Sequence, residues 1–107
     1  MSAVKNEFFG TCEDIANELK ASIGPATGYG IGKPHDQVTE HVFGMRVLEE
    51  SRRFGDAAKV AAAVIIDFAT GYSQQDMLDV IEESMADGVN FDEAVIDTAA
   101  IAWERDF

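Results

Sequence analysis

The stretch from residue 57 to residue 70, AAKVAAAVIIDFAT, constrains the fold more than any other part of the 107-residue chain. From Val60 to Ala69 the residues are apolar on nearly every side of a helix, whereas a helix at a protein surface keeps one polar face. A helix of this kind has to be enclosed by other elements, so we expect it to be central and buried. Gly71 follows it and is predicted to end it.

Apolar residues elsewhere in the chain recur at steps of three and four, and alternation with a period of two is absent over any useful length. This pattern predicts four further helices: one that ends at Gly24-Pro25, one over about 37–54, one opened by Ser73 and one opened by Asn90. The connections between most of them are short, which favours helices that pack as neighbours. We therefore expect one all-α domain over residues 1–107, a compact bundle of about five helices.

The start of the first helix stays open. Val4, Phe8 and Cys12 belong to an apolar stripe that continues to Ile23, which indicates one helix from about residue 4. Thr11 with Asp14 three residues later is typical of an N-cap, which indicates a start near residue 12. For the later helices, the N-caps are predicted at Asp36, Asp56, Ser73 and Asn90.

Three of these helices also have predicted inward faces. In the helix opened by Asn90 these residues are Phe91, Ala94, Val95, Thr98, Ala99 and Ala102. In the helix over 37–54 these residues are Val38, Val42, Phe43, Met45, Val47 and Leu48. In the helix opened by Ser73 they are Met77, Val80, Ile81, Ser84 and Met85.

The segment 24–35, GPATGYGIGKPH, is predicted to be a flexible loop between the first two helices. A phosphate-binding P-loop needs G-x-x-x-x-G-K-[ST], but Thr27 stands at its first glycine and Pro34 at its final hydroxyl position. The segment also follows a helix rather than a strand. Besides a plain linker, one alternative is a loop that contacts a partner through Tyr29 and Ile31.

The net charge of −12 is distributed unevenly. Residues 1–59 carry nine acids against seven Lys and Arg, a net charge of −2. Residues 60–107 carry eleven acids against the single base Arg105, a net charge of −10. The second half is therefore expected to repel nucleic acid and anionic lipid, and to attract basic surfaces.

Carboxylates recur on the predicted outer faces of the last two helices. Two interpretations are open: the carboxylates serve only solubility, or the carboxylates form a surface that binds a basic partner. In the second interpretation Tyr29, Ile31 and Trp103 are candidate apolar anchors. The candidate partner-binding carboxylates are Asp79, Glu82, Glu83, Asp87, Glu93 and Asp97.

The sequence predicts no catalytic, cofactor or metal site, and we expect no enzyme activity. His35 and His41 are six residues apart, so a helix places them on different faces. Cys12 has acidic neighbours that disfavour a thiolate, so we expect a small buried apolar residue there. No apolar run approaches the 18 residues of a membrane span, and the N-terminal segment lacks the core of a signal peptide, so a cytoplasmic protein is expected.

Two functions fit these observations. The first is a small acidic binding or inhibitor protein that docks on a basic protein surface, such as that of a nucleic-acid-binding protein. Small acidic phage proteins that inhibit nucleases, restriction enzymes or CRISPR complexes share this size and charge, though no motif relates the chain to them. The alternative is a homodimeric structural or regulatory subunit, in which a second copy would cover the apolar central helix.

Overall fold

The computed structural model describes the backbone of residues 2–26 and 37–106, and the side chains of residues 7–23 and 40–103. Five α-helices and one turn of 3-10 helix make up this part of the chain, and it contains no strand. The prediction of an all-α bundle is confirmed. The elements are α1 (Ser2–Ala26), α2 (Gln37–Arg52), η1 (Gly55–Ala57), α3 (Ala58–Thr70), α4 (Gln74–Ala86) and α5 (Phe91–Asp106). Tyr29, Ile31 and the predicted cap Asp36 lie outside the described residues.

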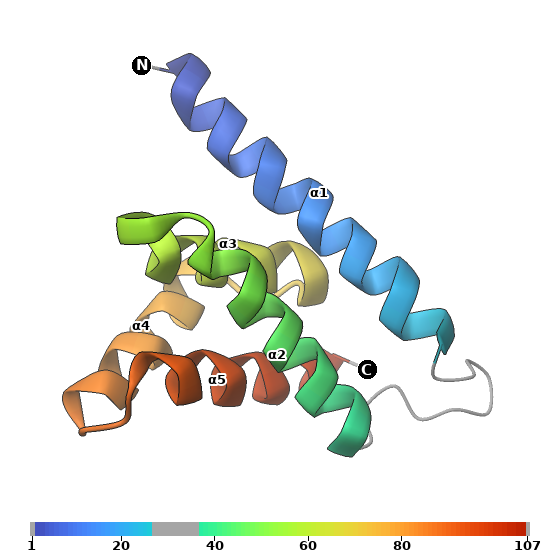
Figure 1. Ribbon diagram of the computed structural model, residues 1–107, viewed down its shortest axis with the longest axis vertical. Coiled ribbons are helices and arrows are strands. Elements are labelled where there is room, and N and C mark those ends of the chain that lie inside the picture. Colours follow the sequence, from blue (N-terminus) through green and yellow to red (C-terminus); the bar gives the residue numbers. More distant parts are fainter. Residues whose placement is uncertain (1, 27–36, 107) are drawn as a thin grey trace.

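The central position of α3 is also confirmed. Every residue from Ala61 to Ile66 is buried, and α3 packs against each of the other four α-helices. In Figure 1 α3 lies behind α2, with α1 along one side of the bundle. One chain therefore buries most of its most apolar helix by itself, although the Phe68 side chain of α3 is 37% exposed. A second copy is not needed to cover residues 61–66, and self-association stays a prediction.

The first helix is a single helix that begins at Ser2, so the predicted start near residue 12 is wrong. The Thr11 hydroxyl donates a hydrogen bond to the Glu7 carbonyl oxygen at 2.9 Å, which is the bond of a threonine inside a helix rather than of an N-cap. Cys12, Ile15 and Leu19 bury the middle of α1 against the core. Nearer the N-terminus, Phe8 meets Phe54 edge to face, with ring centroids 5.3 Å apart.

Local hydrogen bonds explain the boundaries of α4 and α5. The Ser73 hydroxyl accepts a bond from the Asp76 amide at 3.4 Å, and the Asn90 side chain accepts one from the Glu93 amide at 2.8 Å, so both predicted N-caps are confirmed. Asp56, by contrast, lies in η1, and α3 begins without a side-chain cap, so that prediction is wrong.

Two glycines end the helices that precede these caps. Gly71 ends α3 in the left-handed conformation, as predicted. At the end of α4, the Gly88 amide donates to the Met85 carbonyl and the Val89 amide to the Ser84 carbonyl. This pair of bonds is a Schellman motif, and it turns the chain back into α5.

Helices α2 and α5 approach each other closely at Gly44. A Cβ atom at this position would lie 2.9 Å from the Ile96 carbonyl oxygen, so a side chain there would separate the two helices. Because Gly44 faces α5, the buried row of α2 is Phe43, Val47 and Leu48. Val42 and Met45 belong to the outer row and are exposed, so their predicted inward orientation is wrong.

Trp103 lies in this same interface between α2 and α5. Its indole is fully buried, with the ring centroid 4.4 Å from that of Phe43. The prediction that Trp103 is an anchor for a partner is therefore wrong. The side chain is used inside the core, where a large aromatic residue stabilises the fold most.

Candidate functional site

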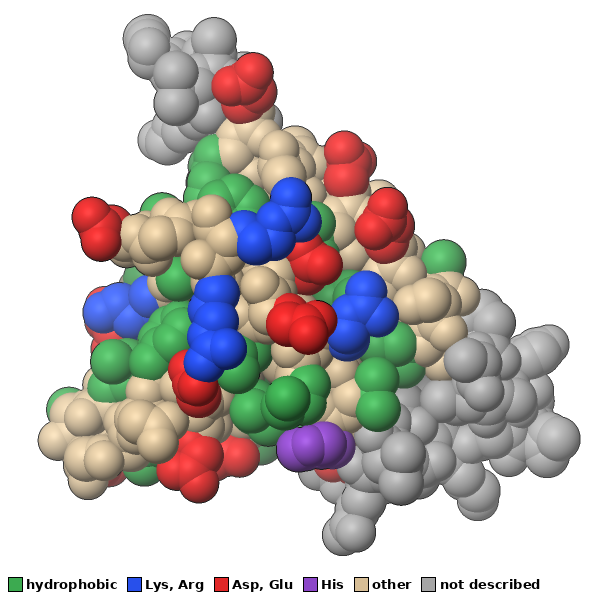
Figure 2. Space-filling model, viewed as in Figure 1, with side chains coloured by type: hydrophobic (Ala, Val, Ile, Leu, Met, Phe, Trp, Pro, Cys, Tyr) green, Lys and Arg blue, Asp and Glu red, His purple; other side chains and the backbone are tan. Residues whose placement is uncertain are grey.

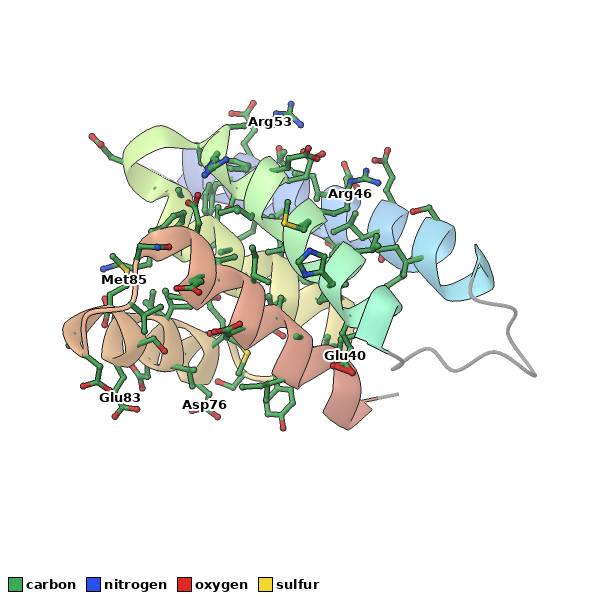
Figure 3. The ribbon with its side chains drawn as sticks, turned by 60° about the horizontal axis from the view of Figure 1, so that its bottom comes forward. Glu40, Arg46, Arg53, Asp76, Glu83 and Met85 are labelled. Carbon is green, nitrogen blue, oxygen red and sulfur yellow. The ribbon has the colours of Figure 1, made fainter. Side chains whose placement is uncertain are left out.

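A row of carboxylates runs along the outer side of α4. Asp76, Asp79, Glu83 and Asp87 follow one another at steps of three and four, which places them on one side of the helix. Met77 and Ile81 occupy the buried side. In Figure 3 Asp76 and Glu83 both point away from the other helices, in the same direction.

Helix α5 carries a second, shorter row. Glu93 and Asp97 are one turn apart and both exposed, whereas Ala94, Val95 and Thr98 are buried. The α4 row ends at Asp87, the C-cap of α4, and the α5 row begins at Glu93 in the first turn of α5, so a single turn of the chain separates them. We call these six residues of α4, its C-cap and α5 the acidic face: Asp76, Asp79, Glu83, Asp87, Glu93 and Asp97.

Two acids of the second half pair with bases of the first half. Lys59 Nζ lies 3.2 Å from Glu82 Oε2, and the Arg52 guanidinium donates to the Asp92 carboxylate. Glu82 is a predicted residue of the binding surface, but its carboxylate forms an ion pair with Lys59 of α3. By contrast, no described Lys or Arg lies within 4 Å of any carboxylate of the acidic face, and only Asp79 accepts a side-chain hydrogen bond, from Gln75.

Two other bases, Arg46 of α2 and Arg53 directly after it, point away from the acidic face. Arg53 pairs with Glu50 at 2.6 Å, and Arg46 lies 3.8 Å from Glu49. Figure 3 shows Arg46 and Arg53 at the opposite edge of the molecule from Asp76 and Glu83. On the side seen in Figure 2, with α2 across its front, Lys and Arg are interspersed with Asp and Glu. Charge is thus mixed around α2 and of one sign along α4.

An open pocket of about 380 Å³ lies beside the α4–α5 turn. Its lining comes from all of the elements except α1: Arg52 from α2, η1, Lys59 and Ala58 from α3, Met85 from α4 and Phe91 from α5. Apolar atoms make up most of this lining. The two ion pairs described above involve its two bases, Arg52 and Lys59.

The sequence missed two parts of this region. Asp76 was assigned only to the N-terminal turn of α4, although its exposed side chain continues the acidic row. Met85 was assigned to the buried face, but it is 38% exposed and lines the pocket. Met85 lies one residue before the end of α4, and Figure 3 shows it near the turn that follows. The helical spacing of Asp76 was a usable signal; the pocket depends on contacts between distant segments.

The described residues contain no group of three or more His, Cys, Asp and Glu side chains arranged to hold a metal ion. Cys12 is completely buried, as predicted, and burial raises its pKa to about 11. A thiol with this pKa stays protonated at neutral pH and is a poor nucleophile.

Comparisons with protein-family models, with curated proteins and with solved structures give no match to this chain. Within the part of the chain that the structure describes, no helix has both the length and the apolar character that crossing a membrane requires.

Proposed function

We propose that this protein is a binding module that docks its acidic face on a basic surface of a partner protein. The observation that carries the proposal is that the six carboxylates of the acidic face have no cation within 4 Å among the described residues. Arg46 and Arg53 pair with acids of α2, and Arg52 and Lys59 pair with Asp92 and Glu82, which lie outside the acidic face. A field of one sign speeds encounter with a basic partner and orients it.

The arrangement has a cost in stability that a partner would offset. Asp79–Glu83, Glu83–Asp87 and Glu93–Asp97 are pairs of like charge four residues apart, and Asp76–Asp79 is a pair three residues apart. Each such pair destabilises a helix by roughly 0.2–0.5 kcal/mol, so the four together cost about 1–2 kcal/mol. That cost is a noticeable part of a typical stability of about 5–15 kcal/mol. Lys or Arg side chains of a partner would replace the repulsion with attraction.

The kind of partner that fits best is a protein that also binds nucleic acid. Carboxylates on successive turns of α4 lie about 5–6 Å apart, so the row offers regularly spaced negative charge on a rigid support, as a phosphate backbone does. A surface that binds phosphates through Lys and Arg would accept it. We therefore propose that the protein inhibits its partner by competing with nucleic acid, the mode used by small acidic inhibitors of phage origin.

The proposal is tested by comparing two variants, one that removes three charges from the acidic face and one that removes three charges from α1. After capture of the partner from the source cell and its purification, calorimetry compares the wild type with the triple variant Asp79→Asn, Glu83→Gln, Asp97→Asn. The matched control is Glu7→Gln, Glu13→Gln, Glu18→Gln, which removes three exposed charges from α1.

We expect the acidic-face variant to bind at least about tenfold more weakly, and the α1 variant to bind within a few-fold of the wild type. Equal losses in the two variants would show that net charge, rather than the acidic face, determines binding, and the proposal would be wrong.

The main argument for the alternative function, a self-associating subunit, is weaker because one chain already buries most of α3. Its support is a set of large apolar side chains that stay exposed, among them Phe68 of α3, Val42 and Met45 of α2, and Ile101 of α5. Light scattering decides between the two: the docking proposal predicts the monomer mass of 11.6 kDa, whereas a subunit that works as a dimer gives twice this value at every salt concentration.

A further inference from the structure

The pocket at the α4–α5 turn has a lining that suits one kind of side chain. It combines two cations, Arg52 and Lys59, with the thioether of Met85 and the ring of Phe91. An aromatic ring is the group that is attracted to all of these, because cations bind its face, a sulfur atom contacts its edge, and a second ring packs against it.

The cations remain available to such a ring. The Arg52 side chain is 54% exposed and that of Lys59 is 39% exposed, although each already has a carboxylate partner. A cation that is held by its own ion pair loses little conformational entropy when a ring stacks on it. Because Asp92 and Glu82 offset part of their charge, Arg52 and Lys59 attract a separate anion less strongly than unpaired bases would.

The surroundings of the pocket decide which molecule carries the ring. Asp56 contributes to the lining, and Glu82 and Asp92 hold its bases, so these acids outnumber the two cations. Asp87, at the end of the acidic face, lies two residues beyond Met85. The region therefore favours a ligand with positive charge around an apolar group.

We propose that this pocket receives an aromatic side chain of the basic partner, flanked in that partner by Lys or Arg. The inference rests on the proposed function and adds an anchor to it: the acidic face supplies attraction that salt weakens, and the pocket supplies a contact that salt affects little. Interfaces of this kind concentrate much of their binding energy in one buried aromatic residue.

Three synthetic peptides test the inference with the intact protein. Each has two arginines on either side of a central residue, which is tryptophan, leucine or alanine. Titration at low salt, followed by NMR of the ¹⁵N-labelled protein, gives affinities and the amides that shift. The tryptophan peptide is expected to bind at least about fivefold more tightly than the alanine peptide. It should shift the amides of Gly55, Ala58, Met85 and Phe91 most strongly.

A pair of variants assigns the effect to the pocket. Met85→Ala is expected to bring the ratio of tryptophan to alanine affinity close to one. The control Ile101→Ala removes a side chain that is 51% exposed on α5 and does not line the pocket, so it should leave the ratio unchanged. Circular dichroism confirms that both variants keep the helical fold.

The outcomes separate this inference from the proposed function. If the tryptophan and alanine peptides bind equally, or if Met85→Ala leaves their ratio unchanged, the pocket is not an anchor site, while binding to the acidic face still stands. If the leucine peptide matches the tryptophan peptide, the commitment to an aromatic ring is wrong. If none of the three binds at low salt, the acidic face does not attract cations and both proposals fail.

Discussion

Replacing Gly44 by alanine should destabilise the protein, although alanine is the better helix former. The new Cβ would lie 2.9 Å from the Ile96 carbonyl oxygen, 3.0 Å from its Cγ2 and 3.1 Å from its Cα. Two of these three atoms belong to the backbone of α5, so no rotation of a side chain relieves the contact. Helices α2 and α5 would have to move apart, which loosens the packing of Phe43 on Trp103.

The size of the effect follows from two opposing terms. Overpacking of a well-packed core costs about 1–3 kcal/mol. Alanine in place of glycine inside a helix stabilises the folded state by about 1 kcal/mol. The net loss for Gly44→Ala is therefore about 0–2 kcal/mol. The matched control is Gly10→Ala in α1, where a Cβ meets nothing within 4 Å, so only the favourable helical term remains.

Urea and thermal unfolding of the two variants measure the difference directly. We expect Gly10→Ala to be more stable than Gly44→Ala by about 1–3 kcal/mol, which is a difference in Tm of at least about 4 °C for a domain of this size. If both substitutions stabilised the protein equally, the close approach of α2 and α5 at Gly44 would be wrong.

Three further predictions concern single groups. Asn90→Ala removes the cap that binds the Glu93 amide and should lower the free energy of unfolding by about 1 kcal/mol in urea, whereas an unchanged value would contradict the cap. Cys12 should react with a thiol reagent at pH 8 only after denaturant is added, because the thiol is buried and its pKa is about 11; a fast reaction of the native protein would contradict this. Burial raises the pKa of Asp67 above 3.8, so the folded state binds this proton more tightly and stability falls as pH rises from 3.8 through the raised value. Asp67→Asn should therefore stabilise the protein at pH 7, with an advantage that disappears below pH 3.8; an advantage that persists in acid would have another cause.

The sequence predicted well those features that depend on neighbouring residues. The caps Ser73 and Asn90 act within one turn of the chain, and Gly71 ends its helix through its own backbone. The burial of α3 was predictable because no rotation of that helix exposes a polar face.

Features that depend on contacts between distant segments were predicted less well. Thr11 and Asp14 have the spacing of an N-cap, but the helix continues through them. The apolar stripe on either side of Thr11 keeps α1 helical because it packs along α3. Val42 and Met45 share the spacing of an inward stripe, and only the contact of Gly44 with α5 shows which side of α2 faces inward.

The candidate site also combines features that depend on neighbouring residues with features that depend on distant segments. The carboxylates of α4 and α5 that form the acidic face follow from helical spacing alone. Three other features arise from how the helices pack: the ion pair between Glu82 and Lys59, the burial of Trp103 and the pocket at Met85. Spacing within a helix is encoded locally, whereas the rotation of one helix against another is set by the whole core.

Carboxylate footprinting tests most directly where the partner binds. The protein alone and the purified complex are labelled with a carbodiimide and an amine, and mass spectrometry measures the extent of modification at each acid. Docking on the acidic face predicts that Asp79, Glu83 and Asp97 become protected in the complex, while Glu7 and Glu13 on α1 are modified as in the free protein. Protection of the α1 acids, with the acids of α4 and α5 still fully modified, would contradict the account.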